Sequence, residues 1–289
     1  MWVLDALVAP TAMGKPYSGY YVDVGRISDK PARSSRVWTV QLEPDAAGED
    51  ALPLVLVHGY LCGSALWVLN LEALSRRRRV YAIDLLGFGK SSRPTLAADP
   101  CTVEDQLAQA LEAWRSELGL DRFLLLGHSF GAFVASAYAL RHPKHVAHLI
   151  LEDPWGFSES RVPDKAFQLW PWLVTAFTRG IQFFRLADIC TVLRAGGILG
   201  PAVLRVVLSH ETNMFRKIVR DETAIVSYFY HCNVRRPRCV FGFLGGFGRN
   251  RRPSFPYTPP SLSDRNRQSV CRLPSALQGV VYTVPTACS

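Results

Sequence analysis

A Gly-x-Ser-x-Gly string between a buried strand and a helix of small residues constrains this chain more than any other feature. Residues 127–131 read Gly-His-Ser-Phe-Gly, and the apolar run Phe123–Leu126 precedes them. Phe130–Arg141 follows with the composition and length of a helix. Because the glycines allow a sharp turn, Ser129 is expected to project as a nucleophile at the carboxyl end of the strand. The alternative is a chance string in a loop, but the flanking strand and helix favour the nucleophile turn.

Three further apolar runs predict buried strands around this one, with helices between them. The strands are expected at Leu52–Val57, Val80–Ile83 and Val146–Leu151, and the helices at Leu66–Leu74 and behind Thr102 as N-cap. Alternation of strands and helices, with strands that are apolar throughout, indicates a mostly parallel sheet covered on both faces. The fold class is therefore α/β.

The chain divides by composition into three predicted parts. Residues 15–157 form the core, which opens with an expected antiparallel pair, Tyr20–Gly25 and Arg36–Leu42. Residues 158–233 are expected to form an inserted cap of several amphipathic helices, rich in aromatic residues. Residues 234–289 are rich in arginine and proline and lack periodicity, which predicts a tail without stable order and without regular packing on the core.

The net charge of +9 is a property of the tail rather than of the whole chain. Residues 234–289 hold nine arginines, one aspartate and no lysine, so +8 of the charge lies there. A nucleic-acid-binding surface normally mixes lysine with arginine, so no nucleic-acid partner is expected. The seven cysteines include no pair at Cys-x-x-Cys spacing, which argues against a zinc site and a disulfide framework. No metal and no cofactor are expected.

No apolar run is long enough for a membrane span, and Met1–Ala12 has neither the basic start of a signal peptide nor an uninterrupted apolar stretch. A cytoplasmic protein is expected, with contact to a membrane surface as an option. Arg76–Arg79 could touch anionic lipid headgroups, although a solvated basic helix end explains them better. The aromatic residues of 166–184 could line an acyl-chain pocket, dip into a membrane interface or pack cap helices on the core.

A second strand end supplies the expected oxyanion donors. His58-Gly59-Tyr60 follows the strand Leu52–Val57. In this arrangement the backbone N–H groups of Tyr60 and Phe130 could hold the oxyanion of a tetrahedral intermediate, assisted by the amino end of the helix behind Ser129. The alternative is a plain strand-to-helix turn that uses glycine.

A nucleophilic serine needs a base, and no histidine stands where the sequence order of this fold predicts one. The order in this fold is serine, acid, then histidine after the final strand, but the last histidine is His231 and no two strands follow the cap. Asp153, at a strand end, could be the triad acid or could simply cap the turn. His148 and Asp153 form a His-x-x-x-x-Asp string that is associated with acyltransferases. Residues five apart in a strand point to opposite faces, so these two are not expected to cooperate.

Several stretches together resemble one subfamily of α/β-hydrolase-domain proteins that act in lipid metabolism. They are Val57–Gly59, Ala82–Ser92, Gly127–Ala132, His148–Phe157 and Tyr228–Asn233. Asp153–Phe157 and the Tyr-His-Cys-Asn at the end of the cap are the specific matches, since Gly-x-Ser-x-Gly indicates only the superfamily. Ala132 stands where this subfamily usually has glycine.

The resemblance implies a serine carboxylic-ester hydrolase of the lysophospholipase or N-acyl-lysophospholipid lipase type. The lipase branch of the subfamily has serine at the nucleophile position, as at Ser129, and the co-activator branch has asparagine. The implied partners are a lipid or lysophospholipid, a membrane, lipid-droplet or mitochondrial surface, and a partner lipase. The alternative is a non-catalytic lipid-binding co-activator or an acyltransferase-like regulator of lipid homeostasis.

The resemblance covers about residues 15–234 and ends after Asn233. Members of the subfamily continue with the last core strands, an acid and the catalytic histidine, none of which can be matched within Val234–Ser289. Impaired catalysis is therefore expected. A frameshifted or alternatively spliced end would produce this change of composition, and transcript sequencing across the Asn233 codon tests that hypothesis. A further alternative to both functions is a truncated product without a stable fold, which thermal unfolding tests.

Overall fold

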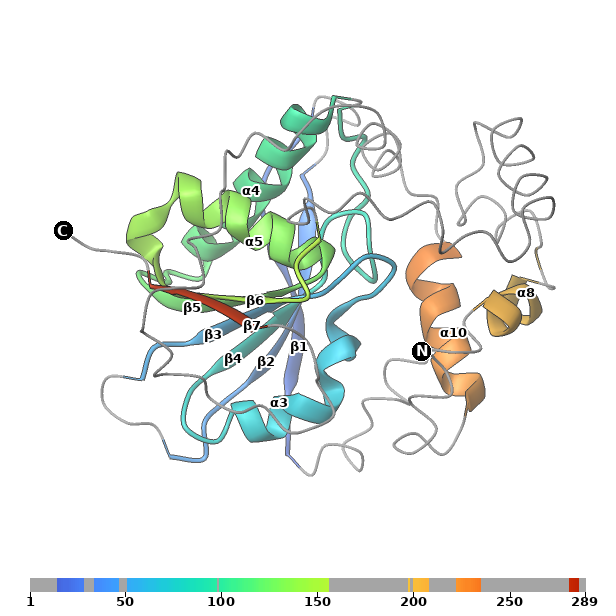
Figure 1. Cartoon of the computed structure of the whole chain (residues 1–289), viewed down its shortest axis with the longest axis horizontal. Helices are drawn as coiled ribbons and strands as arrows, with labels where there is room; N and C mark the ends of the chain where they lie inside the picture. Colours follow the sequence, from blue (N-terminus) through green and yellow to red (C-terminus); the bar gives the residue numbers. More distant parts are fainter. Residues whose placement is uncertain are drawn as a thin grey trace, which may run out of the picture. The chain divides into compact units, whose positions relative to one another are not determined.

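A computed structural model shows a mixed sheet with helices on both faces (Figure 1). The structure describes residues 15–28, 34–46, 51–97, 99–155, 197, 200–207, 222–234 and 281–285. Among them, seven strands form one sheet in the order β1-β2-β4-β3-β5-β6-β7. The chain separates into two compact units, Met1–Gly156 with Arg236–Ser289, and Phe157–Arg235. The predicted domain limits stay predictions.

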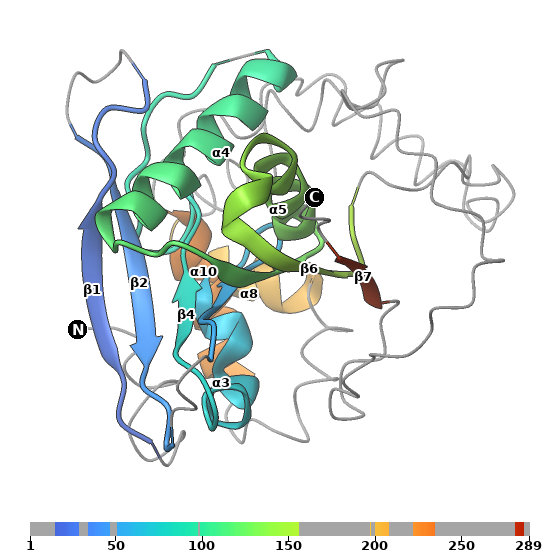
Figure 2. The same cartoon turned by 90° about the vertical axis from the view of Figure 1, so that its left-hand side faces the viewer.

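An antiparallel pair opens the sheet, as predicted. β1 (Ser18–Asp23) pairs with β2 (Arg36–Leu42), and β2 pairs in turn with β4 (Val80–Ile83), also antiparallel. β1 and β2 lie side by side at one edge of the sheet (Figure 2). The alternation of these strands leaves one face buried, and the buried Thr39 accepts a hydrogen bond from Trp114 Nε1 at 2.9 Å. This bond ties the pair to the core.

Four parallel strands form the centre of the sheet, which confirms the predicted fold class. They are β4, β3 (Leu54–Val57), β5 (Phe123–His128) and β6 (Val146–Glu152). Every residue of β3 and β4 is buried. Helices cover both faces and explain why these strands are apolar throughout.

Helices lie on both sides of the sheet. α4 (Pro100–Glu117) and α5 (Phe130–Arg141) lie next to each other on one side (Figure 1). On the other side, the expected helix divides into a 3₁₀ turn, η1 (Ser64–Trp67), and α3 (Val68–Leu74). The two elements together span the predicted range.

The predicted N-cap of α4 is wrong. The helix begins at Pro100, and the cap is Asp99, whose carboxylate accepts a hydrogen bond from the Thr102 N–H at 3.0 Å. Proline is favourable at the first helical position because the N–H that it lacks would have no partner there. A carboxylate at the N-cap satisfies one of the exposed N–H groups of the first turn. The helix therefore starts earlier than the threonine pattern indicated.

The second unit contains two described helices. α8 (Gly200–Val207) and α10 (Glu222–Val234) pack together through the buried side chains of Leu204 and Val226. The Tyr230 hydroxyl donates to the Gly197 carbonyl at 3.0 Å. Both helices lie mainly within the range predicted for the cap, which stays a prediction; apart from Gly197, its other residues, including the aromatics of 166–184, lie outside the described residues.

The prediction that residues 240–289 do not pack regularly on the core is wrong for one segment. β7 (Val281–Pro285) pairs antiparallel with β6 through five residue pairs, from Glu152↔Val281 to His148↔Pro285. The run Val-Tyr-Thr-Val has the β-branched and aromatic composition of a strand, and the open edge of β6 supplies the missing backbone partners. The rest of 235–289 lies outside the described residues.

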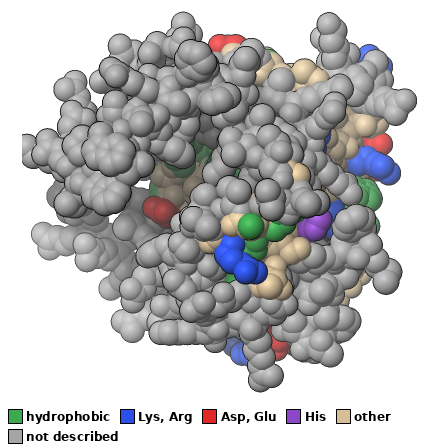
Figure 3. Space-filling model, turned by 90° about the vertical axis from the view of Figure 1, so that its right-hand side faces the viewer, with side chains coloured by type: hydrophobic (Ala, Val, Ile, Leu, Met, Phe, Trp, Pro, Cys, Tyr) green, Lys and Arg blue, Asp and Glu red, His purple; other side chains and the backbone are tan. Residues whose placement is uncertain are grey.

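On the face shown in Figure 3, the described basic, acidic and apolar side chains form small separate groups. In the N-terminal unit, Arg79 Nε contacts Glu43 Oε2 at 3.0 Å, and Arg78 donates to the Leu52 carbonyl. Two of the arginines that follow α3 thus make polar contacts within the protein.

Within the described part of the chain, no helix is both long and apolar enough to cross a membrane.

Candidate active site

Ser129 occupies a strained turn at the carboxyl end of the central strand β5. Its φ is 51° and its ψ is −116°, a conformation that residues with a side chain rarely adopt. β5 ends at His128 and α5 begins at Phe130, so the predicted position of Ser129 is confirmed. Strain of this kind persists only where the surrounding structure imposes it, and it concentrates at functional sites.

The two glycines of the motif are required by close backbone contacts. A Cβ on Gly127 would lie 2.5 Å from the Gly131 carbonyl oxygen, and a Cβ on Gly131 would lie 2.4 Å from the carbonyl oxygens of Val57 and His58. Both distances are far shorter than any real Cβ contact. The glycine at 127 therefore follows from the close approach of the first turn of α5, and the glycine at 131 from the packing of that turn on the end of β3.

Backbone hydrogen bonds hold the turn from β6. The Ser129 N–H donates to the Glu152 carbonyl at 2.9 Å, and the Trp155 N–H donates to the Ser129 carbonyl at 3.2 Å. The Ala132 N–H donates to the same carbonyl at 3.0 Å. The turn at Ser129 is thus bonded both to the helix that follows it and to the end of the neighbouring strand.

The turn after β3 lies directly against Ser129. A Cβ on Gly59 would lie 3.3 Å from Ser129 Cβ. The Tyr60 ring contacts the Phe130 ring edge to face, with centroids 6.4 Å apart. These contacts bring together the two turns that carry the expected oxyanion donors, the N–H groups of Tyr60 and Phe130. Their role as donors stays a prediction.

Among the described residues, the ionisable side chains beside the turn include His128, Glu152 and Asp153. The first two were not singled out as site residues from the sequence. His128 Nδ1 is buried without a hydrogen-bond partner, and burial lowers the pKa of this histidine, partly opposed by the Asp153 carboxylate. Glu152 is buried, which raises its pKa, and its Oε2 also has no partner. His128 and Glu152 face each other in the β5–β6 register, a signal that strand pairing would have supplied.

Asp153 lies one residue beyond β6, is exposed and has a φ of 43°. Its charge acts on both His128 and Glu152, so it lies beside the nucleophile turn. Its proposed role as the triad acid, like the alternative of a simple turn residue, stays a prediction.

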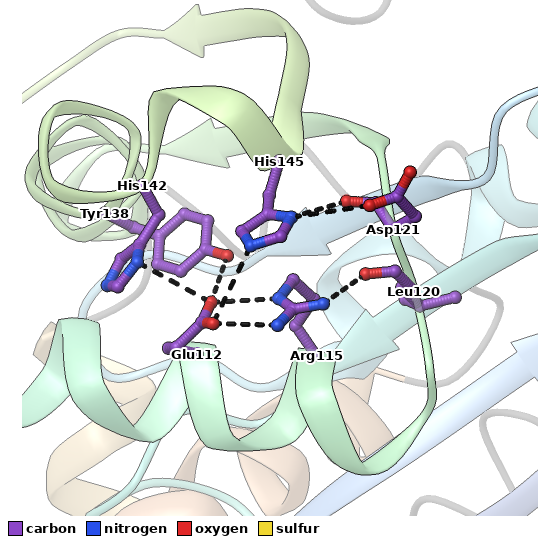
Figure 4. Close-up of polar contacts among 7 residues, drawn as sticks. All are labelled: Glu112, Arg115, Leu120, Asp121, Tyr138, His142 and His145. Atoms are coloured by element: carbon purple, nitrogen blue, oxygen red, sulfur yellow. Dashed lines mark hydrogen bonds and ion pairs between the residues drawn. The ribbon is translucent and has the colours of Figure 1, made fainter.

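Other histidines of the core belong to the opposite end of the sheet. His142 follows α5, and His145 ends the 3₁₀ turn η2 (Pro143–His145), which leads into the amino end of β6. Both face Glu112 of α4, with nitrogens 3.8 and 3.9 Å from its carboxylate oxygens (Figure 4). His148 pairs with Leu124 near the amino end of β5.

Two further histidines follow the core in the chain. His231 lies on α10 in the second unit, and His210 lies outside the described residues. No group of three or more His, Cys, Asp or Glu side chains in the described part of the chain is placed to hold a metal ion.

A groove of about 540 Å³ is lined by residues that include Lys15 and Glu72, and Ser129 is not among its lining residues.

Comparison with known proteins agrees with this architecture. A family model described as the alpha/beta hydrolase fold matches residues 53–262, a range that runs past Asn233. The chain is 38% identical over 222 residues to the mouse (Lyso)-N-acylphosphatidylethanolamine lipase, covering 76% of this chain and 63% of the relative. It is 40% identical over 209 residues to the pig 1-acylglycerol-3-phosphate O-acyltransferase ABHD5, covering 71% and 57%.

The chain thus spans about three fifths of the length of these relatives. Among solved structures, a probable hydrolytic enzyme from Pseudomonas aeruginosa PAO1 is similar in fold, with a TM-score of 0.52 and 22% identity over 76% of this chain and 63% of the other. The strand order, the turn at Ser129 and the family match lead to one conclusion. This chain belongs to the α/β-hydrolase family and resembles its lyso-N-acylphosphatidylethanolamine lipase and ABHD5 members.

Proposed function

We propose that this chain is a lipid-metabolising serine hydrolase that cleaves a carboxylic ester of a lysophospholipid or N-acyl-lysophospholipid. The observation that carries the proposal is the strained turn of Ser129 at the end of β5, with the Gly59 turn packed against it. The similarity to a (lyso)-N-acylphosphatidylethanolamine lipase supports the substrate class.

In the proposed reaction, Ser129 Oγ attacks the ester carbonyl and forms a tetrahedral intermediate. The N–H groups of Tyr60 and Phe130 and the amino end of α5 stabilise the oxyanion. The intermediate collapses to an acyl-enzyme with release of the alcohol, and water then releases the fatty acid. These steps require a base that accepts the Ser129 proton and returns it to the leaving group.

We further propose that turnover by this chain is slow. Both ring nitrogens of His58 are engaged in hydrogen bonds, and His142 and His145 belong to the far end of the sheet. A serine hydroxyl without a paired base remains protonated near neutral pH and is a poor nucleophile. Triad members act as a unit, so loss of the base removes most of the rate enhancement.

A second candidate is a non-catalytic lipid-binding co-activator or an acyltransferase-like regulator. The supporting observation is the similarity to ABHD5, which is as high as that to the lipase. Such a protein would bind a lipid and a partner lipase and would not use Ser129 as a nucleophile. The proposed location is cytoplasmic, peripheral on membranes, lipid droplets or mitochondria, and flotation with liposomes or isolated droplets tests the surface contact.

A labelled fluorophosphonate probe separates the two candidates because it labels a serine that acts as a nucleophile, and a weakly activated serine reacts slowly. Under the first, the purified chain reacts slowly with the probe and slowly releases fatty acid from N-acyl-lysophosphatidylethanolamine, and Ser129→Ala loses both. Ser136→Ala is a matched control, since Ser136 lies within α5, the helix that Ser129 precedes, and its hydroxyl donates to the Ala132 carbonyl. A folded chain that binds lipid vesicles but never reacts with the probe supports the second candidate.

A further inference from the structure

His58 is buried completely and uses both ring nitrogens within the protein. Its Nδ1 lies 2.7 Å from the Gly59 carbonyl oxygen, and the Leu85 N–H donates to its Nε2 at 3.0 Å. Because a backbone N–H can only donate, Nε2 is the acceptor and the ring proton is on Nδ1. The Nδ1–H therefore donates to the Gly59 carbonyl. Burial lowers the pKa of His58, which favours this neutral form despite the opposing Asp84 charge.

The bond to the Gly59 carbonyl has a geometric consequence for the next residue. The Gly59 carbonyl and the Tyr60 N–H belong to one planar peptide unit, in which the two bonds point in opposite directions. A hydrogen bond that fixes the carbonyl therefore also fixes the direction of the Tyr60 N–H. This N–H is the expected second donor to the oxyanion.

Gly59 makes such a constraint necessary. A Cβ on this glycine would lie 2.7 Å from His128 Nδ1 and 3.3 Å from Ser129 Cβ, so any other residue would displace the His128 ring. The same lack of a side chain gives glycine more backbone freedom than any other residue. The Cys62 N–H also donates to the Gly59 carbonyl, at 3.3 Å, so the His58 bond at 2.7 Å is the shorter of the two that orient this peptide and the Tyr60 N–H. The His58 ring restricts that freedom without adding bulk beside Ser129.

The imidazole is itself held by the strand end beyond it. Leu85 follows Asp84, whose buried carboxylate accepts the Ser64 N–H at 2.6 Å and the Lys90 N–H at 2.8 Å. The Phe88 ring contacts the His58 ring, with centroids 5.6 Å apart. The orientation of the Gly59–Tyr60 peptide is thus connected through His58 to the end of β4.

We propose that His58 is a positioning residue that directs the Tyr60 N–H toward the oxyanion formed on the Ser129 substrate. The proposal rests on the proposed hydrolase function of Ser129. A preorganised donor acts mainly in the transition state, because the negative charge develops there. Loss of the positioning is therefore expected to lower kcat and leave KM unchanged.

Two neutral variants separate positioning from packing. His58→Asn places an amide N–H near the position of Nδ1 and keeps the donor to Gly59, whereas His58→Gln reaches the position of Nε2 and keeps the acceptor for Leu85. Asparagine is the smaller residue and leaves the larger cavity, so a purely structural role predicts that His58→Asn is the more damaged variant. The positioning role predicts the reverse order for kcat.

We expect His58→Gln to lose about 10²-fold in kcat and in the rate of fluorophosphonate labelling, the loss typical of one oxyanion donor. His58→Asn should retain most of both, although its midpoint of urea unfolding is lower. A kcat that follows the stability of the two variants, or a loss that falls on KM alone, overturns the proposal.

The backbone ¹H–¹⁵N resonance of Tyr60 provides a readout that does not depend on turnover. It should remain close to its wild-type position in His58→Asn and shift in His58→Gln. An unshifted Tyr60 resonance in His58→Gln contradicts the positioning by His58, whether or not the chain is active. A wild-type chain that neither reacts with the probe nor releases fatty acid contradicts the proposed function, while the resonance still decides the role of His58.

Discussion

The Tyr138 hydroxyl donates a hydrogen bond of 2.7 Å to the Glu112 carboxylate and joins α5 to α4 at the far end of the helix that starts behind Ser129. Arg115 binds both carboxylate oxygens, at 2.9 and 2.8 Å. His145 Nδ1 is hydrogen-bonded to the Asp121 carbonyl, and its Nε2 points toward the Glu112 carboxylate (Figure 4). Glu112 is therefore the common partner of several groups from α4, α5 and η2.

Replacement of Glu112 by glutamine should destabilise the protein by about 1–3 kcal/mol, the usual cost of losing charge-assisted hydrogen bonds. Urea unfolding measures the effect. Glu117→Gln is a matched control on the same helix, because Glu117 is exposed, and it should change the free energy of unfolding by less than about 0.5 kcal/mol. Equal effects of the two substitutions would mean that the Glu112 contacts contribute nothing specific.

The same carboxylate should make stability depend on acid pH. Burial alone raises the pKa of Glu112, but hydrogen bonds from Arg115 and Tyr138 and the Arg115 charge outweigh it and lower the pKa from 4.5 to about 2. A carboxylate with a depressed pKa stabilises the fold above its unfolded pKa, and this contribution is lost as the pH falls through its folded value. The stability advantage of wild type over Glu112→Gln should therefore disappear between about pH 4.5 and pH 2, as followed by urea unfolding at each pH.

The strained backbone of Ser129 should be visible in stability. Ser129→Gly and Ser129→Ala both remove the hydroxyl, but only glycine adopts a φ of 51° without a steric penalty. We expect Ser129→Gly to be more stable than Ser129→Ala by about 1 kcal/mol, since backbone strain of this kind costs roughly 1–3 kcal/mol and part is offset by the entropy of glycine. Urea unfolding of both variants measures this difference. Equal stabilities, or a more stable Ser129→Ala, would show that the turn stores no strain.

Alanine at Gly127 and alanine at Gly59 should differ in their cost to stability. A Cβ on Gly127 meets backbone atoms of Gly131 and Ala132 at 2.5–2.7 Å, whereas a Cβ on Gly59 meets the side chains of His128 and Ser129. Backbone atoms of a sheet and helix move less readily than a histidine ring. Gly127→Ala should therefore destabilise more than Gly59→Ala, by about 1 kcal/mol or more. Thermal unfolding of the two variants tests the order.

Hydrolysis by the purified chain should be weak compared with a relative that carries the C-terminal histidine. The oxyanion hole and binding alone leave a residual of about 10³–10⁴ over the uncatalysed rate. Release of fatty acid from a lysophospholipid measures this directly. Robust hydrolysis that Ser129→Ala abolishes would contradict the expectation. If His210→Ala or His231→Ala also abolished it, the cap would supply the base.

Much of the core could be predicted because its signals are local. Continuous apolar runs gave the parallel strands, and the glycines around Ser129 identified the turn that the structure shows. The start of α4 was missed because both Asp99 and Thr102 are good caps, and the choice depends on Pro100 at the first helical position. The pairing of Val281–Pro285 with β6 was missed because strand pairing depends on an edge distant in sequence.

The sequence by itself determined the family, the buried strands and the position of the candidate nucleophile, since each follows from periodicity or from a short motif in its local context. Only the tertiary structure decided what surrounds that serine: the Gly59 turn against its Cβ, the tautomer of His58, and the buried, unpartnered atoms His128 Nδ1 and Glu152 Oε2. These features arise from contacts between strands far apart in the chain. The directions of hydrogen bonds and the burial of charges exist only once the strands are packed together.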